Sequence, residues 1–158
     1  MKQVYLFDWG DTLMIDFPNV AGKMCEWENV EAVPGAEEAL EFLSRNAKIY
    51  IATGAADSTE IEIKQAFERV GLSKFITGYF CKANIGLSKG SPEFLKAIIL
   101  KLNVSADNVA IVGDSFEKDI QPALSLGIQP FWFTKNNQSS TSNNVVAIQK
   151  LSDLTINY

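Results

Sequence analysis

Short apolar runs alternate with amphipathic helical patterns along most of the chain, and this alternation limits the fold more than any other feature of the sequence. Each run has the length of a buried strand and is far shorter than a membrane span. The runs cover residues 4–7, 49–52, 78–81, 109–112 and 130–133. Strands that alternate with helices are typical of right-handed βαβ crossovers, which build a parallel sheet with helices on both faces.

Apolar residues spaced three and four apart predict the helices between these strands. They cover residues 36–43, 63–70, 92–102 and 122–127. The sequence therefore predicts an α/β fold, a Rossmann-like three-layer sandwich with a mostly parallel central sheet of about five strands. Residues 13–33 do not follow the pattern, and residues 135–144 read as a polar loop. No linker divides the chain, so we expect a single domain over residues 1–158.

The composition excludes several classes of function. A net charge of −5, with Lys and Arg nowhere clustered, argues against binding to nucleic acid. No apolar segment predicts a membrane span or a secretion signal, so we expect a cytoplasmic protein. The chain has no histidine, which excludes a Ser-His-Asp or Cys-His mechanism and argues against a typical zinc site. Cys25 and Cys81 have no ligand spacing and read as reduced thiols.

Polar residues follow the predicted strands at the edge of the sheet where ligands bind in folds of this kind. Any one of them could be a turn or capping residue. Together they offer a carboxylate nucleophile, acidic ligands for a hard divalent cation, a hydroxyl donor and a cation, which is the set that phosphoryl transfer requires. They are Asp8, Thr53, Gly54, Lys89, Gly113, Asp114, Ser115 and Asp119.

Four segments that contain these residues resemble, in their order along the chain, the motifs of the haloacid dehalogenase-like hydrolases, most of which are Mg2+-dependent phosphatases. The segments read FDWGDTL, IATGA, LSKGSPEF and VGDSFEKDI. The order of Asp, Thr, Lys and Asp differs from that of two-component receiver domains, whose phosphoacceptor lies on a later strand. The resemblance implies a phosphomonoester phosphatase with Mg2+ as cofactor and a phosphorylated substrate of unknown identity.

By the same resemblance, Asp8 would form an aspartyl-phosphate, and Thr53 and Gly54 would bind the phosphoryl oxygens. Lys89 would neutralise charge on the nucleophile and the phosphate. Asp8, Asp114 and the backbone carbonyl of Gly10 would hold Mg2+. The supporting residues would be Asp119, which would orient these ligands or pair with Lys89, and Ser115.

The first motif departs from the family at one position. Phosphatases of this kind usually read Asp-x-Asp-Gly-Thr, and the second aspartate transfers a proton to the leaving oxygen and later activates water. Here Gly10 stands at that position and Asp11 follows it. Asp11 could reach back through the flexible glycine to act as the acid, the acid could be absent, or Asp11 could be a turn residue in a catalytically weak binding module.

Dehalogenases and phosphonate-cleaving enzymes of the family also lack the second aspartate, so these chemistries remain alternatives. Both need a cap over a small substrate. Residues 13–33 are too few for a helical cap, and we expect them to form a short flap instead. Lys23, Met24 and Trp27 would touch the substrate, or Phe17, Met24 and Trp27 would pack the flap onto the core. No residue outside the four motifs indicates which substrate is bound. The sequence is compatible with a homo-oligomer.

Overall fold

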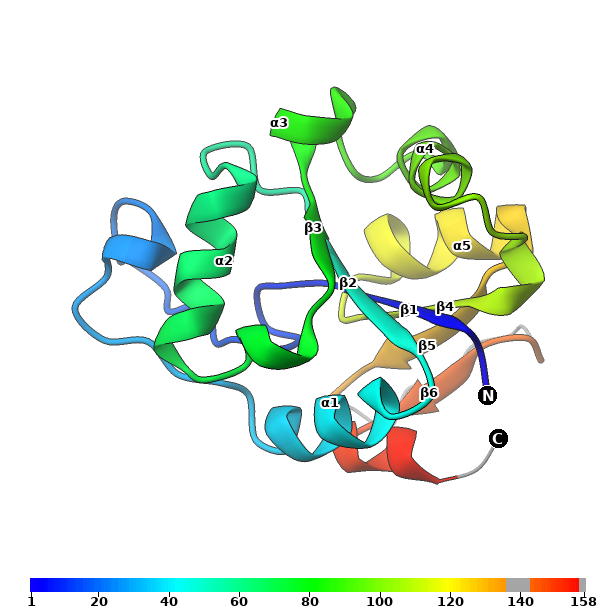
Figure 1. Cartoon of the computed structure of the whole chain (residues 1–158), viewed down its shortest axis with the longest axis horizontal. Helices are drawn as coiled ribbons and strands as arrows, with labels where there is room; N and C mark the ends of the chain where they lie inside the picture. The colour runs from blue at the N-terminus through cyan, green and yellow to red at the C-terminus, as the bar shows by residue number, and fades with distance from the viewer. Residues whose placement is uncertain (136–142, 157–158) are drawn as a thin grey trace.

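A computed structural model describes residues 1–135 and 143–156, so most of the predicted polar loop at 135–144 lies outside the described residues. The described strands form one sheet in the order β3-β2-β1-β4-β5-β6, and every neighbouring pair is parallel (Figure 1). The strands are β1 (Val4–Phe7), β2 (Lys48–Ala52), β3 (Gly78–Phe80), β4 (Val109–Gly113), β5 (Gln129–Phe133) and β6 (Val146–Ile148). The predicted α/β sandwich is confirmed.

The sheet has one strand that the sequence pattern did not reveal. β6 pairs with β5 in parallel, with Phe131 opposite Val146. Only three residues belong to this strand, and one of them is exposed. A run this short does not show the alternation that identifies a strand from sequence alone.

Helices cover both faces of the sheet, as Figure 1 shows. One face carries α1, α2 and the 3-10 turn at Leu151–Thr155, and the opposite face carries α4 and α5. β1 supplies both cores because its side chains alternate: Tyr5 and Phe7 enter the first core, and Val4 and Leu6 enter the second. The helices are α1 (Ala36–Ser44), α2 (Glu60–Arg69), α3 (Lys82–Ile85), α4 (Pro92–Leu102) and α5 (Gln121–Leu126).

The predicted helices are present, with shifted ends. α2 begins three residues before the predicted start because Thr59 and Glu62 form a capping box, with hydrogen bonds of 2.9 and 3.3 Å between side chain and backbone. α5 ends at Leu126, and the next residue, Gly127, has a φ of 80°, the left-handed conformation that glycine adopts just after a helix end. The four-residue α3 was not predicted.

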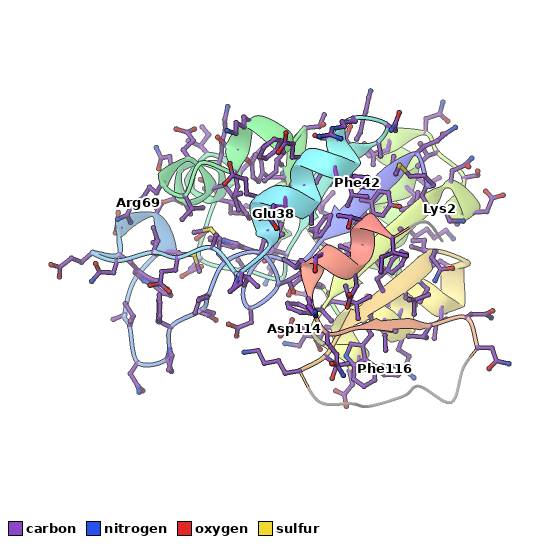
Figure 2. The ribbon with its side chains drawn as sticks, turned by 90° about the horizontal axis from the view of Figure 1, so that it is seen from below. Lys2, Glu38, Phe42, Arg69, Asp114 and Phe116 are labelled. Atoms are coloured by element: carbon purple, nitrogen blue, oxygen red, sulfur yellow. The ribbon has the colours of Figure 1, made fainter. Side chains whose placement is uncertain are left out.

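Residues 13–33 fold back against α2. The segment is closed at its base, where the Ile15 amide donates to the Glu31 carbonyl at 2.9 Å and Met14 bridges to Ala32. Arg69, at the end of α2, lies beside this segment in Figure 2, and its guanidinium donates to the backbone carbonyls of residues 24, 25, 27 and 28. The segment is therefore fastened at its base and at residues 24–28.

Cys25 and Cys81 are both free thiols, and Cys81 is buried. Among the described residues, no helix combines the length and the apolar character needed to span a bilayer.

Phe67 on α2 offers a test of the packing on the first face. Its ring is fully buried and packs against Trp9 and Tyr79, at centroid distances of 6.1 and 5.8 Å. We expect Phe67→Ala to lower the free energy of unfolding by about 3–5 kcal/mol, because it removes a large buried ring and leaves a cavity. Urea unfolding monitored by circular dichroism measures the change.

Ile61→Ala is the matched control on the same helix. The Ile61 side chain is 68% exposed, so we expect a change within about 0.5 kcal/mol. Equal losses of stability for the two variants would contradict this description of the core.

Candidate active site

The polar residues that follow the central strands converge at one edge of the sheet. Asp8 comes directly after β1, Thr53 after β2 and Asp114 after β4, and β1 lies between the other two strands. The amide of Asp8 continues the ladder by donating to the Val112 carbonyl at 2.9 Å. These residues therefore lie at the carboxyl ends of three neighbouring strands, as the sequence pattern predicts.

Lys89 enters this edge from the loop between α3 and α4. Its ammonium donates to Asp8 Oδ1 at 2.7 Å and forms an ion pair with Asp119. The Lys89 side chain is only 6% exposed. A Cβ at Gly54 would lie 3.3 Å from the Lys89 Cβ, so the backbone after β2 closely approaches this lysine.

Asp119 is held by the loop that follows β4. It lies in a π-helical turn, Phe116–Ile120, and its Oδ2 accepts from the Ser115 amide at 3.2 Å. A Cβ at Gly113 would lie 2.2 Å from the same carboxylate oxygen, which is shorter than any real contact. Only glycine fits at position 113 while Asp119 keeps this place. Figure 2 shows Asp114 and Phe116 in this loop.

Thr12 is a buried residue of the site that the sequence reasoning missed. Its hydroxyl donates to Asp8 Oδ2 at 3.1 Å and lies 3.5 Å from Asp114 Oδ1. Asp8 thus has a donor at each oxygen, Lys89 at one and Thr12 at the other. The signal available in the sequence was a hydroxyl residue four positions after the candidate nucleophile.

The carboxylates outnumber the cation at this edge, and their pKa values are displaced accordingly. Burial raises the pKa of Asp8, but Lys89 outweighs it and the resulting pKa is below the ordinary value. Burial and the nearby Asp8 raise the pKa of Asp114 to about 7. Burial also raises the pKa of Asp119 to about 6, although Lys89 opposes this shift.

Three carboxylates meet closely enough to hold a cation. Oxygens of Asp8, Asp114 and Asp119 all lie within 4.8 Å of one another. Three negative charges less the one positive charge of Lys89 leave an excess of two when all are ionised. Carboxylate oxygens are the ligands that hard divalent cations prefer, so the donor set fits Mg2+ in both chemistry and charge.

Asp11 occupies a tight turn at the end of β1. Its φ of 60° is left-handed, a conformation that aspartate tolerates better than most residues. Its carboxylate accepts from the Asp16 amide, five positions on, at 3.0 Å, and this contact closes the turn. The role of Asp11 as a proton donor stays a prediction.

Two cavities lie at this edge of the sheet, and Asp114 lines the second of them. The first, of about 360 Å3, lies between Thr53 and the segment 13–33, and Trp9, Met24 and Trp27 line it together with Gly10. Met24 and Trp27 are also part of the first core, so the packing interpretation of these two residues is confirmed. The second cavity, of about 640 Å3, lies between Asp114, Trp132 and the same segment.

Thr53 presents its hydroxyl to the first cavity. The side-chain oxygen accepts from the Ala55 amide at 3.1 Å, which leaves the hydroxyl proton free to donate to a ligand oxygen. The residue is buried, and its own amide donates to the Phe80 carbonyl at 3.0 Å. This geometry suits the predicted contact with a phosphoryl oxygen.

Comparison with known proteins agrees with the site. A family model described as haloacid dehalogenase-like hydrolase matches residues 3–127, which include the residues gathered at the sheet edge. The chain belongs to this family. The resemblance inferred from the four motifs is therefore confirmed, and the protein is a haloacid dehalogenase-like hydrolase by sequence and by fold.

Relatives of this hydrolase include two phosphatases of archaeal species. It is 26% identical over 115 residues to a ribulose-1,5-bisphosphate 5-phosphatase of Halopiger xanaduensis, over 73% of this chain and 47% of that protein. It is also 26% identical over 118 residues to a glyceraldehyde 3-phosphate phosphatase of Methanocaldococcus jannaschii, over 75% of this chain and 48% of that protein. The chain thus spans about half the length of the curated relatives it matches.

A solved structure of similar length has the same fold. An uncharacterized protein from Listeria monocytogenes serotype 4b superimposes with a TM-score of 0.82 at 20% identity, over 97% of this chain and 94% of that one. This similarity shows that the two chains share the same α/β fold.

The displaced pKa values predict how stability depends on pH in the hydrolase without a divalent cation. The folded protein keeps protons on Asp114 up to about pH 7 and on Asp119 up to about pH 6, whereas the unfolded chain releases them near pH 4. The stability from these protons is present at low pH and is lost as the pH rises toward 7. We expect the melting temperature to fall between about pH 5 and about pH 7.

Thermal unfolding in a chelating buffer measures this slope, and Asp114→Asn is the comparison. The variant lacks the titrating group, so its melting temperature should fall less over the same interval. A wild-type melting temperature that rises from about pH 5 to about pH 7 would contradict the raised pKa values.

Proposed function

We propose that this hydrolase is a Mg2+-dependent phosphatase of phosphomonoesters that works through an aspartyl-phosphate on Asp8. The observation that carries the proposal is the environment of Asp8. This carboxylate is buried at the end of the central strand, its pKa is lowered by Lys89, and Lys89 and Thr12 orient its two oxygens. An ionised and oriented carboxylate at the carboxyl edge of the sheet has the properties of a nucleophile.

The residues around Asp8 suit each step of phosphoryl transfer. One carboxylate oxygen of Asp8 attacks the phosphorus, and the bond from phosphorus to the ester oxygen breaks, with its electron pair leaving on that oxygen. Lys89 compensates the negative charge of nucleophile and phosphoryl group, and the Thr53 hydroxyl donates to a phosphoryl oxygen. Water then attacks the phosphorus, which releases phosphate and restores the Asp8 carboxylate.

Asp8 and Asp114, with the backbone carbonyl of Gly10, would hold the Mg2+ ion. Asp119 would support this set, since it already pairs with Lys89. A bound Mg2+ neutralises charge on the phosphoryl group during transfer.

The first cavity favours an organic group without a second negative charge. Among the described residues that line it, Asp16 and Asp57 are acidic and none is Lys or Arg. The nearby cations are already engaged: Lys23 pairs with Glu62 at 2.5 Å, and Arg69 binds backbone carbonyls. We propose an uncharged or cationic monophosphate ester as the preferred substrate class, in preference to a bisphosphate.

Phosphate release from a panel of esters tests this proposal. With Mg2+, wild type should release phosphate, and faster from monophosphates than from bisphosphates of the same alcohol. Asp8→Asn should lose more than about 10³-fold in turnover, because a neutral amide is a far weaker nucleophile. Chelation should abolish release, and added Mg2+ should restore it.

Asp107→Asn is the matched control, since it makes the same chemical change at an exposed residue just before β4, at the opposite end of that strand. It should keep wild-type turnover. Ligand binding without release of phosphate, unchanged by Asp8→Asn, would contradict the phosphatase and indicate a binding module instead.

A further inference from the structure

The side chain of Asp16 lies against the position that a side chain at Gly10 would occupy. Gly10 stands where phosphatases of this family usually carry their second aspartate. A Cβ at Gly10 would lie 3.3 Å from the Asp16 Cβ and 3.5 Å from Asp16 Oδ2. The carboxylate is therefore present at this place, but it comes from the segment after β1 instead of from the strand end itself.

Backbone contacts fix Asp16 in this position. Its amide donates to Asp11 Oδ1 at 3.0 Å. The preceding residue, Ile15, donates its amide to the Glu31 carbonyl at 2.9 Å. Met14 bridges both to Gly10 and to Ala32. The turn thus brings the chain back to Gly10, and the Asp11 carboxylate stabilises this turn by accepting from the Asp16 amide.

Asp16 is also the carboxylate best placed to meet a substrate. It lines the first cavity beside Gly10 and Thr53, and the second beside Asp114. Asp11 lines only the second of these two cavities. Asp57 lines only the first of them, and its carboxylate accepts from the Ser58 hydroxyl at 3.3 Å.

We propose that Asp16 is the general acid and base of the reaction, in the role that Gly10 cannot fill; this inference rests on the proposed phosphatase function. In the first step the Asp16 carboxyl gives its proton to the leaving ester oxygen, which departs as an alcohol while Asp8 becomes phosphorylated. In the second step the Asp16 carboxylate takes a proton from water as the water oxygen attacks phosphorus. Phosphate leaves, and both carboxyl groups return to their starting forms.

Rapid-quench kinetics on Asp16→Asn separates these two steps. With 4-nitrophenyl phosphate the leaving group needs no proton, so the variant should release one nitrophenolate per enzyme at close to the wild-type rate. Steady-state turnover should then be about 10²–10⁴-fold slower, because aspartyl-phosphate hydrolysis has lost its base. With ethyl phosphate, whose leaving group needs a proton, the variant should show no burst and a loss of at least the same size.

Two further variants control for a structural effect. Glu28→Gln removes the same charge from an exposed side chain of the same segment and should match wild type in both phases. Gly10→Asp combined with Asp16→Gly returns the carboxylate to the strand end, where the φ of residue 10 lies outside the left-handed region. This double variant should recover turnover of ethyl phosphate relative to Asp16→Gly alone.

The outcomes distinguish this inference from the proposed function. An Asp16→Asn variant that matches wild type on ethyl phosphate, or that loses the burst with 4-nitrophenyl phosphate, would overturn the role of Asp16 while the phosphatase stands. If Asp11→Asn, and not Asp16→Asn, kept the burst with 4-nitrophenyl phosphate but lost steady-state turnover, the role would belong to Asp11. A double variant that turns over ethyl phosphate as slowly as Asp16→Gly would contradict the inference that Asp16 takes the place of an aspartate at residue 10. Wild type without release from any ester would refute the phosphatase, and the role of Asp16 with it.

Discussion

The ion pairs of Lys89 with Asp8 and Asp119 organise the rest of the site. A buried ammonium costs several kcal/mol unless it is paired, so the position of Lys89 requires both carboxylates beside it. Asp8 belongs to the end of β1, and Asp119 to the loop after β4. Burial disfavours the charged form of Lys89, but the two carboxylates outweigh it and raise the pKa of the lysine, which therefore stays charged.

This arrangement explains several local features that have no other evident reason. Gly113 makes room for Asp119, and Gly54 allows the backbone after β2 to approach Lys89. Thr12 supplies the second donor to Asp8, on the oxygen that Lys89 does not use. The carboxylates carry more negative charge than Lys89 offsets, and together with burial this raises the pKa values of Asp114 and Asp119. A bound divalent cation would neutralise the excess charge.

The segment 13–33 adds a second layer to this site. Arg69 fastens its far part to α2, and the turn at Asp11 brings its near part back to Gly10. A carboxylate that this family usually places on the strand end can therefore come from the segment, at Asp16. The same segment provides the Met24 and Trp27 wall of the first cavity, so under the two proposals one stretch of chain would bear on both proton transfer and substrate preference.

The sequence predicted the sheet edge well and the segment 13–33 poorly, and the reason is physical. Residues such as Asp8 and Asp114 directly follow apolar runs, so the strand pattern alone places them. The position of Asp16 depends on the left-handed turn at Asp11 and on backbone contacts with Glu31 and Ala32, none of which has a periodic signal. β6 escaped notice because three residues are too few to show an alternation.

The location of the phosphoryl group during turnover tests the mechanism through Asp8. Wild type would be mixed with 4-nitrophenyl phosphate and Mg2+, quenched in acid, digested and analysed by mass spectrometry. The account predicts an acid-stable phosphoryl group on the peptide that contains Asp8, and on that side chain. A phosphoryl group on another residue would contradict a mechanism through Asp8. So would phosphate release in which neither wild type nor Asp16→Asn traps a phosphoryl group.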